Sequence, residues 1–193
     1  MVQPAPISRR GFLQLGLAGG AGAAALTLLQ SLGPLPGRYE ALIGQEQPLV
    51  LNRKELAVLS LFVADVIGAP AGELSPEQTR SAARVDLELS KHGGRMLADT
   101  KAALAVLEHG PLVRGWLSRY SGLDASSRAT YLASLQRSPR SILRQTYSGL
   151  RFFALFFYYS DERSWPRIGY GGPWVPEKRY VGGNRIANLE RLS

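Results

Sequence analysis

The segment that most constrains the fold is residues 140–159, RSILRQTYSGLRFFALFFYY, in the last third of the chain. Its second half, from Leu150 to Tyr159, places apolar side chains on every side of a helix. A helix that is apolar all round is normally buried all round. This run is about half as long as the roughly 20 residues that a membrane-spanning helix needs. We therefore expect a central core helix, a helix that contacts another protein, or both.

Residues 52–67 predict another helix, with a defined start and end. Asn52 and Glu55 have the spacing of a capping box, in which each side chain accepts a backbone N–H of the other residue. Apolar residues then recur at helical spacing as far as Ile67. Gly68 begins a stretch of Gly, Ala and Pro that ends the helix.

The remaining helices are predicted from start and stop signals, and no segment has a clear strand pattern. We expect one helix from the capping box at Ser75–Gln78 to about Lys91, and another from the break at Gly93–Gly94 to the stop at Gly110–Pro111. A short helix is expected over 112–120, and a further one after the cap Asp124. The last helix is expected from Ser138–Pro139 to Tyr159. The predicted fold class is therefore all-α. It is a single small domain of about six helices, followed by an extended C-terminal tail rich in Gly, Pro and aromatic residues.

The N-terminal region resembles a twin-arginine export signal. Its residues follow the pattern of Ser or Thr, two arginines, any residue, and Phe-Leu, at positions Ser8, Arg9, Arg10, Phe12 and Leu13. No charged residue occurs from Gly11 to Gly37, which is typical of the apolar part of a signal sequence. An ordinary N-terminal membrane helix is the alternative interpretation.

The same region leaves open whether the leader is removed. Ala23–Ala25 satisfy the small-residue rule for cleavage, whereas Leu26–Leu29 continue the apolar run. An uncleaved leader is long enough to cross a bilayer. The expected location is thus the periplasm, either free or anchored to the inner membrane. We divide the chain into a signal (1–37), a linker with little helical pattern (38–51), a helical domain (52–160) and an extended tail (161–193).

The net charge of +8 is unevenly distributed along the chain. Residues 114–193 hold 13 basic and 5 acidic side chains, and nearly all of the basic ones are arginine. Arginine is well suited to protein interfaces because its planar group binds carboxylates and stacks on aromatic rings. Nucleic-acid binding fits poorly with an export signal. The chain has no cysteine, which excludes disulfides, thiolate metal sites, c-type haem attachment and cysteine nucleophiles.

No set of residues predicts catalysis or a metal site. His92 follows Glu88 by four residues, which supplies at most half a metal site, so we expect a solvated pair. His109 is expected at a helix C-terminus, where the helix dipole favours an imidazolium. The adjacent Asp161 and Glu162 are expected to pair with neighbouring arginines. We therefore predict no catalytic residues, metal or cofactor in this chain.

Because no catalytic, metal or cofactor site is predicted in this chain, the export signal needs another explanation. The twin-arginine route carries folded proteins, typically because a cofactor was inserted before export. A small helical domain without a cofactor does not need that route. One explanation is that the signal serves a partner, which is loaded with cofactor, lacks its own leader and leaves the cytoplasm bound to this chain.

The stretch 156–174, FFYYSDERSWPRIGYGGPW, resembles the C-terminal motif of the gluconate 2-dehydrogenase subunit 3 family. In that family an aromatic helix ends in a Tyr pair, a polar loop with Trp and Pro follows, and a Gly-Tyr-x-Gly-Pro sequence closes the motif. The matching positions here are Tyr158, Tyr159, Ser160, Trp165, Pro166, Gly169, Tyr170, Gly172 and Pro173. The helix predicted over 52–67 also has a counterpart in the family.

The resemblance implies a small subunit of an FAD-dependent alcohol or sugar dehydrogenase. In such complexes FAD is bound by a large subunit of the glucose–methanol–choline oxidoreductase group, and a multi-haem cytochrome c subunit often accepts the electrons. The small subunit is needed for export and maturation of the large one. Because this chain lacks cysteine, a disulfide link to that subunit is excluded.

Trp, Tyr and Arg are the residue types that most often anchor interfaces. The predicted contacts with the partner are Phe156, Tyr159, Arg163, Trp165, Arg167, Tyr170 and Trp174. A tail that folds back over its own core helix is the alternative. Two other functions stay open: a free-standing helical envelope protein that binds a small ligand, and an enzyme in its own right.

Overall fold

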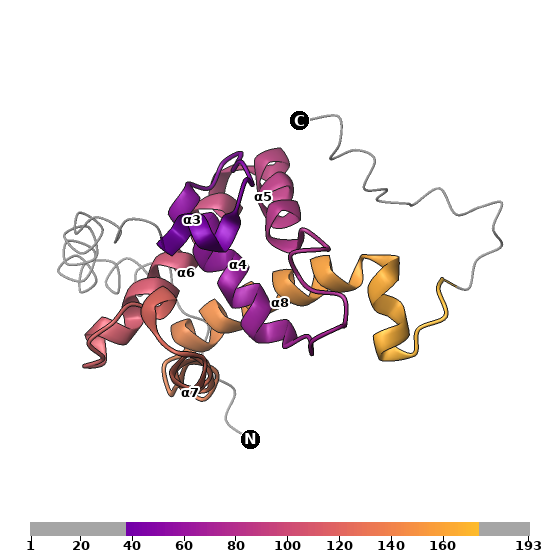
Figure 1. Cartoon of the computed structure of the whole chain (residues 1–193). Helices are drawn as coiled ribbons and strands as arrows, with labels where there is room; N and C mark the ends of the chain where they lie inside the picture. The colour runs from indigo at the N-terminus through magenta and orange to yellow at the C-terminus, as the bar shows by residue number, and fades with distance from the viewer. Residues whose placement is uncertain (1–37, 174–193) are drawn as a thin grey trace, which may run out of the picture.

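The computed structural model describes residues 38–173, which form a helical domain (Figure 1). The all-α prediction is confirmed, since this part of the chain contains helices, turns and loops and no strand. The elements in chain order are α3 (Arg38–Ile43), α4 (Arg53–Ile67), α5 (Ser81–His92), α6 (Gly94–Val113), the 3-10 helix η1 (Tyr120–Gly122), α7 (Ala125–Gln136), α8 (Ser141–Tyr159) and the 3-10 helix η2 (Glu162–Ile168).

Helix α4 is the centre of the domain and packs against α3, α5, α6, α7 and α8. The predicted capping box starts it, because Asn52 Oδ1 accepts the N–H of Glu55 at 2.8 Å and Glu55 Oε2 accepts the N–H of Asn52 at 2.8 Å. Gly68 ends it in the left-handed conformation that glycine adopts without strain. Seven of its residues are buried: Leu56, Ala57, Val58, Leu59, Phe62, Val63 and Ile67.

The segment 38–51, expected to be a linker, contains helix α3. Six residues make too short a helix to be stable alone, so its stability comes from tertiary contacts. Tyr39 and Ile43 are buried in the core, and Tyr39 Oη donates to the buried carboxylate of Glu108 at 2.6 Å. Asp86 holds the rest of the segment by accepting the backbone N–H groups of Leu49, Val50 and Leu51.

Two predicted helix boundaries differ from the structure around α5 and α6. The Ser75–Gln78 box forms, but α5 begins only at Ser81 because Arg80 has a left-handed backbone conformation. Helix α6 runs through the predicted stop at Gly110–Pro111 as far as Val113. Pro111 lies in the last turn, where its missing N–H removes one helical hydrogen bond without ending the helix.

Of the other predicted boundaries, some are confirmed and some are wrong. The break at Gly93 and the cap at Asp124 are confirmed, and Asp124 Oδ1 accepts the N–H of Ser127 at 2.9 Å. The short helix expected over 112–120 is wrong, since turns and bends lead from α6 to η1. The start of the expected tail is a 3-10 helix, η2, rather than extended chain.

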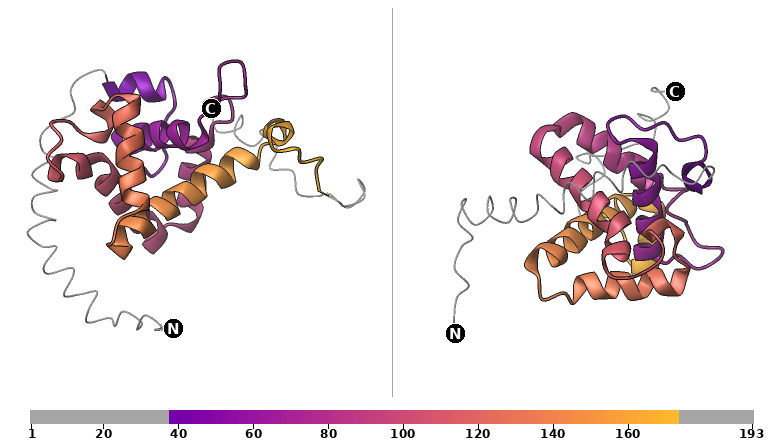
Figure 2. Two further views of the ribbon diagram at one scale, coloured as in Figure 1. Left: turned by 90° about the horizontal axis from the view of Figure 1, so that it is seen from below. Right: turned by 90° about the vertical axis from the view of Figure 1, so that its left-hand side faces the viewer.

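Helix α8 runs along the domain and carries η2 beyond its C-terminal end, on the side away from α6 and α7 (Figures 1 and 2). It buries Leu150, Ala154, Phe157 and Tyr158 and leaves Phe152 and Phe156 exposed. Within this chain α8 is therefore a core helix on one side only: it has a buried core face and an exposed aromatic outer face.

Candidate functional site

The outer face of α8 presents two stacked phenylalanines to solvent. Phe152 is 60% exposed and Phe156 is 53% exposed. Their positions differ by four, which places them one above the other on a helix. The ring centroids lie 5.6 Å apart with an interplanar angle of 24°. Phe156 also meets the buried ring of Phe157 edge-on at 5.2 Å, which connects the exposed pair to the core.

These two rings belong to a longer stripe with the spacing of a helix–helix seam. The outer stripe consists of Ile142, Gln145, Gly149, Phe152 and Phe156, which follow one another at steps of three and four residues and are all exposed. This spacing keeps one narrow line of a helix toward a partner. Exposed Gly149 lets another backbone approach closely at the middle of the stripe.

The charged side chains of α8 near the stripe are all positive. Helix α8 contains no Asp or Glu, and both of its arginines, Arg144 and Arg151, are exposed. A shallow hollow of about 440 Å³ beside the stripe is lined by Gln136, Tyr147, Ser148, Arg151, Phe152, Leu155 and Phe156. An apolar surface bordered by arginine is complementary to an apolar surface bordered by carboxylates.

The η2 segment after α8 is bound to the domain by its first arginine. Asp161 is buried and accepts from the side chain of Arg163 at 2.9 and 2.8 Å, as expected for this acidic residue. The hydrogen bond from Arg163 lowers the pKa of Asp161 below its ordinary value, against the opposing effect of burial. Arg163 also donates to the backbone carbonyl of Gln78 at 2.9 Å, so it joins η2 to the segment before α5.

Arg167 makes a second connection, to the end of α4. Its guanidinium donates to the carbonyl of Ile67 at 3.0 Å and lies 3.4 Å from the carboxylate of Glu73. Arg167 also donates to Tyr158 Oη at 3.5 Å. Arg167 is therefore a structural residue of the domain as well as a charged group at its surface.

Trp165 of η2 packs between the end of α8 and the residues that follow η2. The indole N–H of Trp165 donates to the carbonyl of Tyr159 at 2.9 Å, which closes η2 against the end of α8. Trp165 and Tyr170 meet edge-on, with ring centroids 5.0 Å apart. Gly172 has a φ of +103°, and a β-carbon there would lie 3.3 Å from the Trp165 ring. The Gly-Tyr-x-Gly sequence thus forms a compact turn around Trp165.

The predicted partner residues fall into three groups. Phe156 and Tyr170 are exposed and available for contact. Tyr159, Arg163, Trp165 and Arg167 make contacts or hydrogen bonds within the domain, which agrees with the alternative that this segment folds back. Trp174 and the signal residues Ser8, Arg9, Arg10, Phe12 and Leu13 lie outside the described residues.

Phe152, Ile142 and Gly149 belong to the outer stripe but were not among the predicted residues. The spacing of three and four residues along 142–156 carries this signal in the sequence. It is hidden because, in the second half of α8, the outer face is apolar like the core face, so that composition alone does not show which side is outside.

Two histidines were predicted to have structural roles. His92 is exposed, and its Nδ1 lies 3.3 Å from Glu88 Oε1, which confirms the solvated pair. His109 is buried, and its Nε2 lies 3.1 Å from Lys54 Nζ. Burial and the nearby charge of Lys54 lower the pKa of His109 to about 4. The expected imidazolium at a helix end is wrong, because this side chain is neutral at pH 7.

Residues 38–173 contain no cluster of three or more side chains suited to hold a metal ion. No helix within the same range is long and apolar enough to cross a membrane. Comparisons of the chain with models of known families, with curated proteins and with solved structures find no significant match. The family resemblance of the motif at 156–174 therefore stays a prediction.

Proposed function

We propose that this chain is the non-catalytic small subunit and export escort of a periplasmic FAD-dependent dehydrogenase of the glucose–methanol–choline type. The observation that carries the proposal is the exposed, stacked Phe152–Phe156 pair on α8, beside a segment that resembles the small-subunit motif. Exposed aromatic rings inside an arginine border are typical of a surface that another protein covers.

In this proposal the large subunit covers the outer stripe. Burying a phenylalanine completely contributes about 1.5–3 kcal/mol, so two half-exposed rings together supply about that amount. Because α8 has no carboxylate, the matching face of the partner would be apolar in the middle and acidic at the border. The η2 segment, which is bound to the domain, would hold Tyr170 in a fixed position at one end of this surface.

In this proposal the two chains have different roles. The large subunit would bind FAD and oxidise an alcohol or sugar, and a cytochrome c subunit would accept the electrons. This chain would supply the twin-arginine signal at Arg9 and Arg10 and stabilise the folded flavoprotein for the translocase. An uncleaved leader would also anchor the complex to the inner membrane.

The test is to co-express the chain with a leaderless FAD-dependent dehydrogenase subunit from the same cell and to measure bound flavin in the periplasm. Arg9→Lys with Arg10→Lys should keep the flavoprotein in the cytoplasm. Phe152→Ser with Phe156→Ser should reduce the co-purified flavin at least about tenfold. Leu117→Ser, at an exposed apolar residue in the loop after α6, is the matched control and should leave it unchanged. Normal export of the flavoprotein with the lysine variant would refute the escort role.

A further inference from the structure

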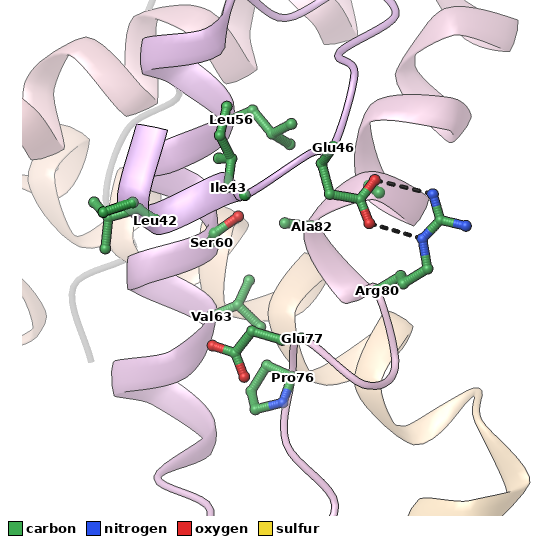
Figure 3. A pocket seen from close by; sticks show the side chains of 13 residues that line it. Leu42, Ile43, Glu46, Leu56, Ser60, Val63, Pro76, Glu77, Arg80 and Ala82 are labelled. Carbon is green, nitrogen blue, oxygen red and sulfur yellow. Dashed lines mark hydrogen bonds and ion pairs between the residues drawn. The ribbon is translucent and has the colours of Figure 1, made fainter. Parts of the chain in front are cut away.

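A second site lies on another part of the domain, in a pocket between α3, α4 and the start of α5 (Figure 3). Its volume is about 380 Å³. It is separate from the outer stripe of α8, since the two share no lining residue. The lining residues are Ala41, Leu42, Ile43, Gly44, Glu46, Leu56, Ser60, Val63, Pro76, Glu77, Arg80, Ala82 and Ala83.

The interior of this pocket is apolar and well supported. Ile43, Leu56, Val63 and Ala82 are all buried members of the hydrophobic core. Small-molecule sites commonly have volumes of roughly 300–1,000 Å³, apolar walls and a few polar groups. A dry cavity of about 150 Å³ already binds benzene. The pocket is therefore large enough for a substituted aromatic ring.

One polar group is available on the α4 wall. The hydroxyl of Ser60 points into the pocket between Ile43 and Val63 (Figure 3). It has no hydrogen-bond partner among residues 38–173. A hydroxyl in this position can donate to, or accept from, one polar atom of a ligand.

An ion pair forms one side of the pocket. Arg80 donates to Glu46 at 2.8 and 2.9 Å, which joins the loop after α3 to the start of α5 (Figure 3). Within residues 38–173, Arg80 is the one residue other than glycine with a positive φ, at +50°. Strained backbone of this kind concentrates at ligand sites, where surrounding contacts maintain it. Here Arg80 is held by its side-chain hydrogen bonds to Glu46 and by its backbone N–H, which donates to the carbonyl of Glu77 at 2.9 Å.

The charges near the pocket restrict its ligand. Glu46 and Arg80 neutralise each other, and Glu77 adds a carboxylate at the edge that disfavours an anion. The apolar walls disfavour any ion, because an unpaired charge is costly to remove from water. We propose that this pocket binds an uncharged small molecule, a substituted aromatic ring whose hydroxyl or carbonyl group bonds to Ser60. The site goes beyond the proposed function and does not depend on a partner subunit.

The experiment uses the full chain labelled with ¹⁵N and titrated with phenol and with benzene. Both probes should shift the amide resonances of the pocket residues and not those of α8. Phenol should bind about three- to tenfold more tightly, as expected for one neutral hydrogen bond. Ser60→Ala should abolish this preference while benzene still binds. Ser60→Leu, which fills the pocket, should weaken both probes at least about tenfold.

A second filling variant, Ala83→Leu, enters the pocket from α5 and covers the case in which Ser60→Leu does not fold. Ser90→Leu, on the exposed side of α5, is the matched control and should leave binding unchanged. Probe-induced shifts confined to other parts of the domain would overturn the proposal. Undiminished binding by a folded filling variant would overturn it as well.

Discussion

Tyr131 of α7 lies directly against Gly110 of α6, and its hydroxyl donates to the carbonyl of Val106 at 3.1 Å. A β-carbon at position 110 would be 3.1 Å from Tyr131 Cζ and would overlap the hydroxyl oxygen. Position 110 therefore has to be glycine for α6 and α7 to approach this closely. The glycine serves a contact between helices and does not end α6.

Gly110→Ala is expected to destabilise the protein by about 1–3 kcal/mol, because the added methyl group overpacks a buried contact. Thermal or urea unfolding measures the effect. The matched control is Gly149→Ala, at an exposed helical glycine with no neighbouring atom within 4 Å. There the same change should stabilise the protein by about 0.5–1 kcal/mol. Equal effects of the two substitutions would contradict the overlap.

Tyr39→Phe is expected to lower the free energy of unfolding by about 1–3 kcal/mol. The change removes one donor from the buried carboxylate of Glu108, which also accepts the backbone N–H and the hydroxyl of Ser121. Urea unfolding gives the difference directly. Tyr147→Phe is the control, because the hydroxyl of that half-buried tyrosine makes no hydrogen bond within the described residues. If both variants are equally stable, the Tyr39–Glu108 bond contributes nothing.

The stability of the protein should depend on His109 in acid. Its pKa of about 4 in the folded state lies below the ordinary value of about 6.5, so the unfolded chain binds more protons between these values. The contribution of His109 is complete above pH 6.5 and is lost as the pH falls to about 4. The loss is at most about 1.4 kcal/mol per pH unit.

His109→Gln should flatten this part of the pH–stability profile, measured by urea unfolding from pH 4 to pH 8. His92→Gln, at an exposed histidine, is the matched control. If the slope between pH 4 and pH 6.5 is the same in His109→Gln as in the natural chain, the prediction of a lowered pKa for His109 is wrong.

Asp86→Asn is expected to loosen the segment between α3 and α4. The carboxylate accepts three backbone N–H groups, from Leu49, Val50 and Leu51, whereas an amide has one oxygen and adds two donors of its own. The expected loss is about 1–3 kcal/mol. Hydrogen exchange at these three amides should accelerate in the variant. Asp99→Asn, on the exposed side of α6, should change neither quantity.

The residue types of the candidate site could be predicted from the sequence, but their orientation could not. The aromatic segment 150–159 and the arginines after it are evident in the sequence as features of an interface. Which rings face outward could not be predicted, because both faces of α8 are apolar and the choice depends on where α4 and α5 pack. Arg163 and Arg167 are of a residue type that is common at interfaces. Their hydrogen bonds within the domain could not be predicted, because the accepting carbonyls, of Gln78 and Ile67, lie far away in the sequence.

Local chemistry was sufficient wherever a helix is started or ended by its own neighbours. The capping box of Asn52 and Glu55, the cap at Asp124 and the glycine at position 68 all act over a few residues, and each was predictable from the sequence. The tertiary structure decided α3, the late start of α5, the continuation of α6 and the neutral state of His109. Each of these depends on contacts between residues that are distant along the chain, such as Tyr39 with Glu108 and Glu46 with Arg80. Burial and pairing of that kind exist only once the helices have packed.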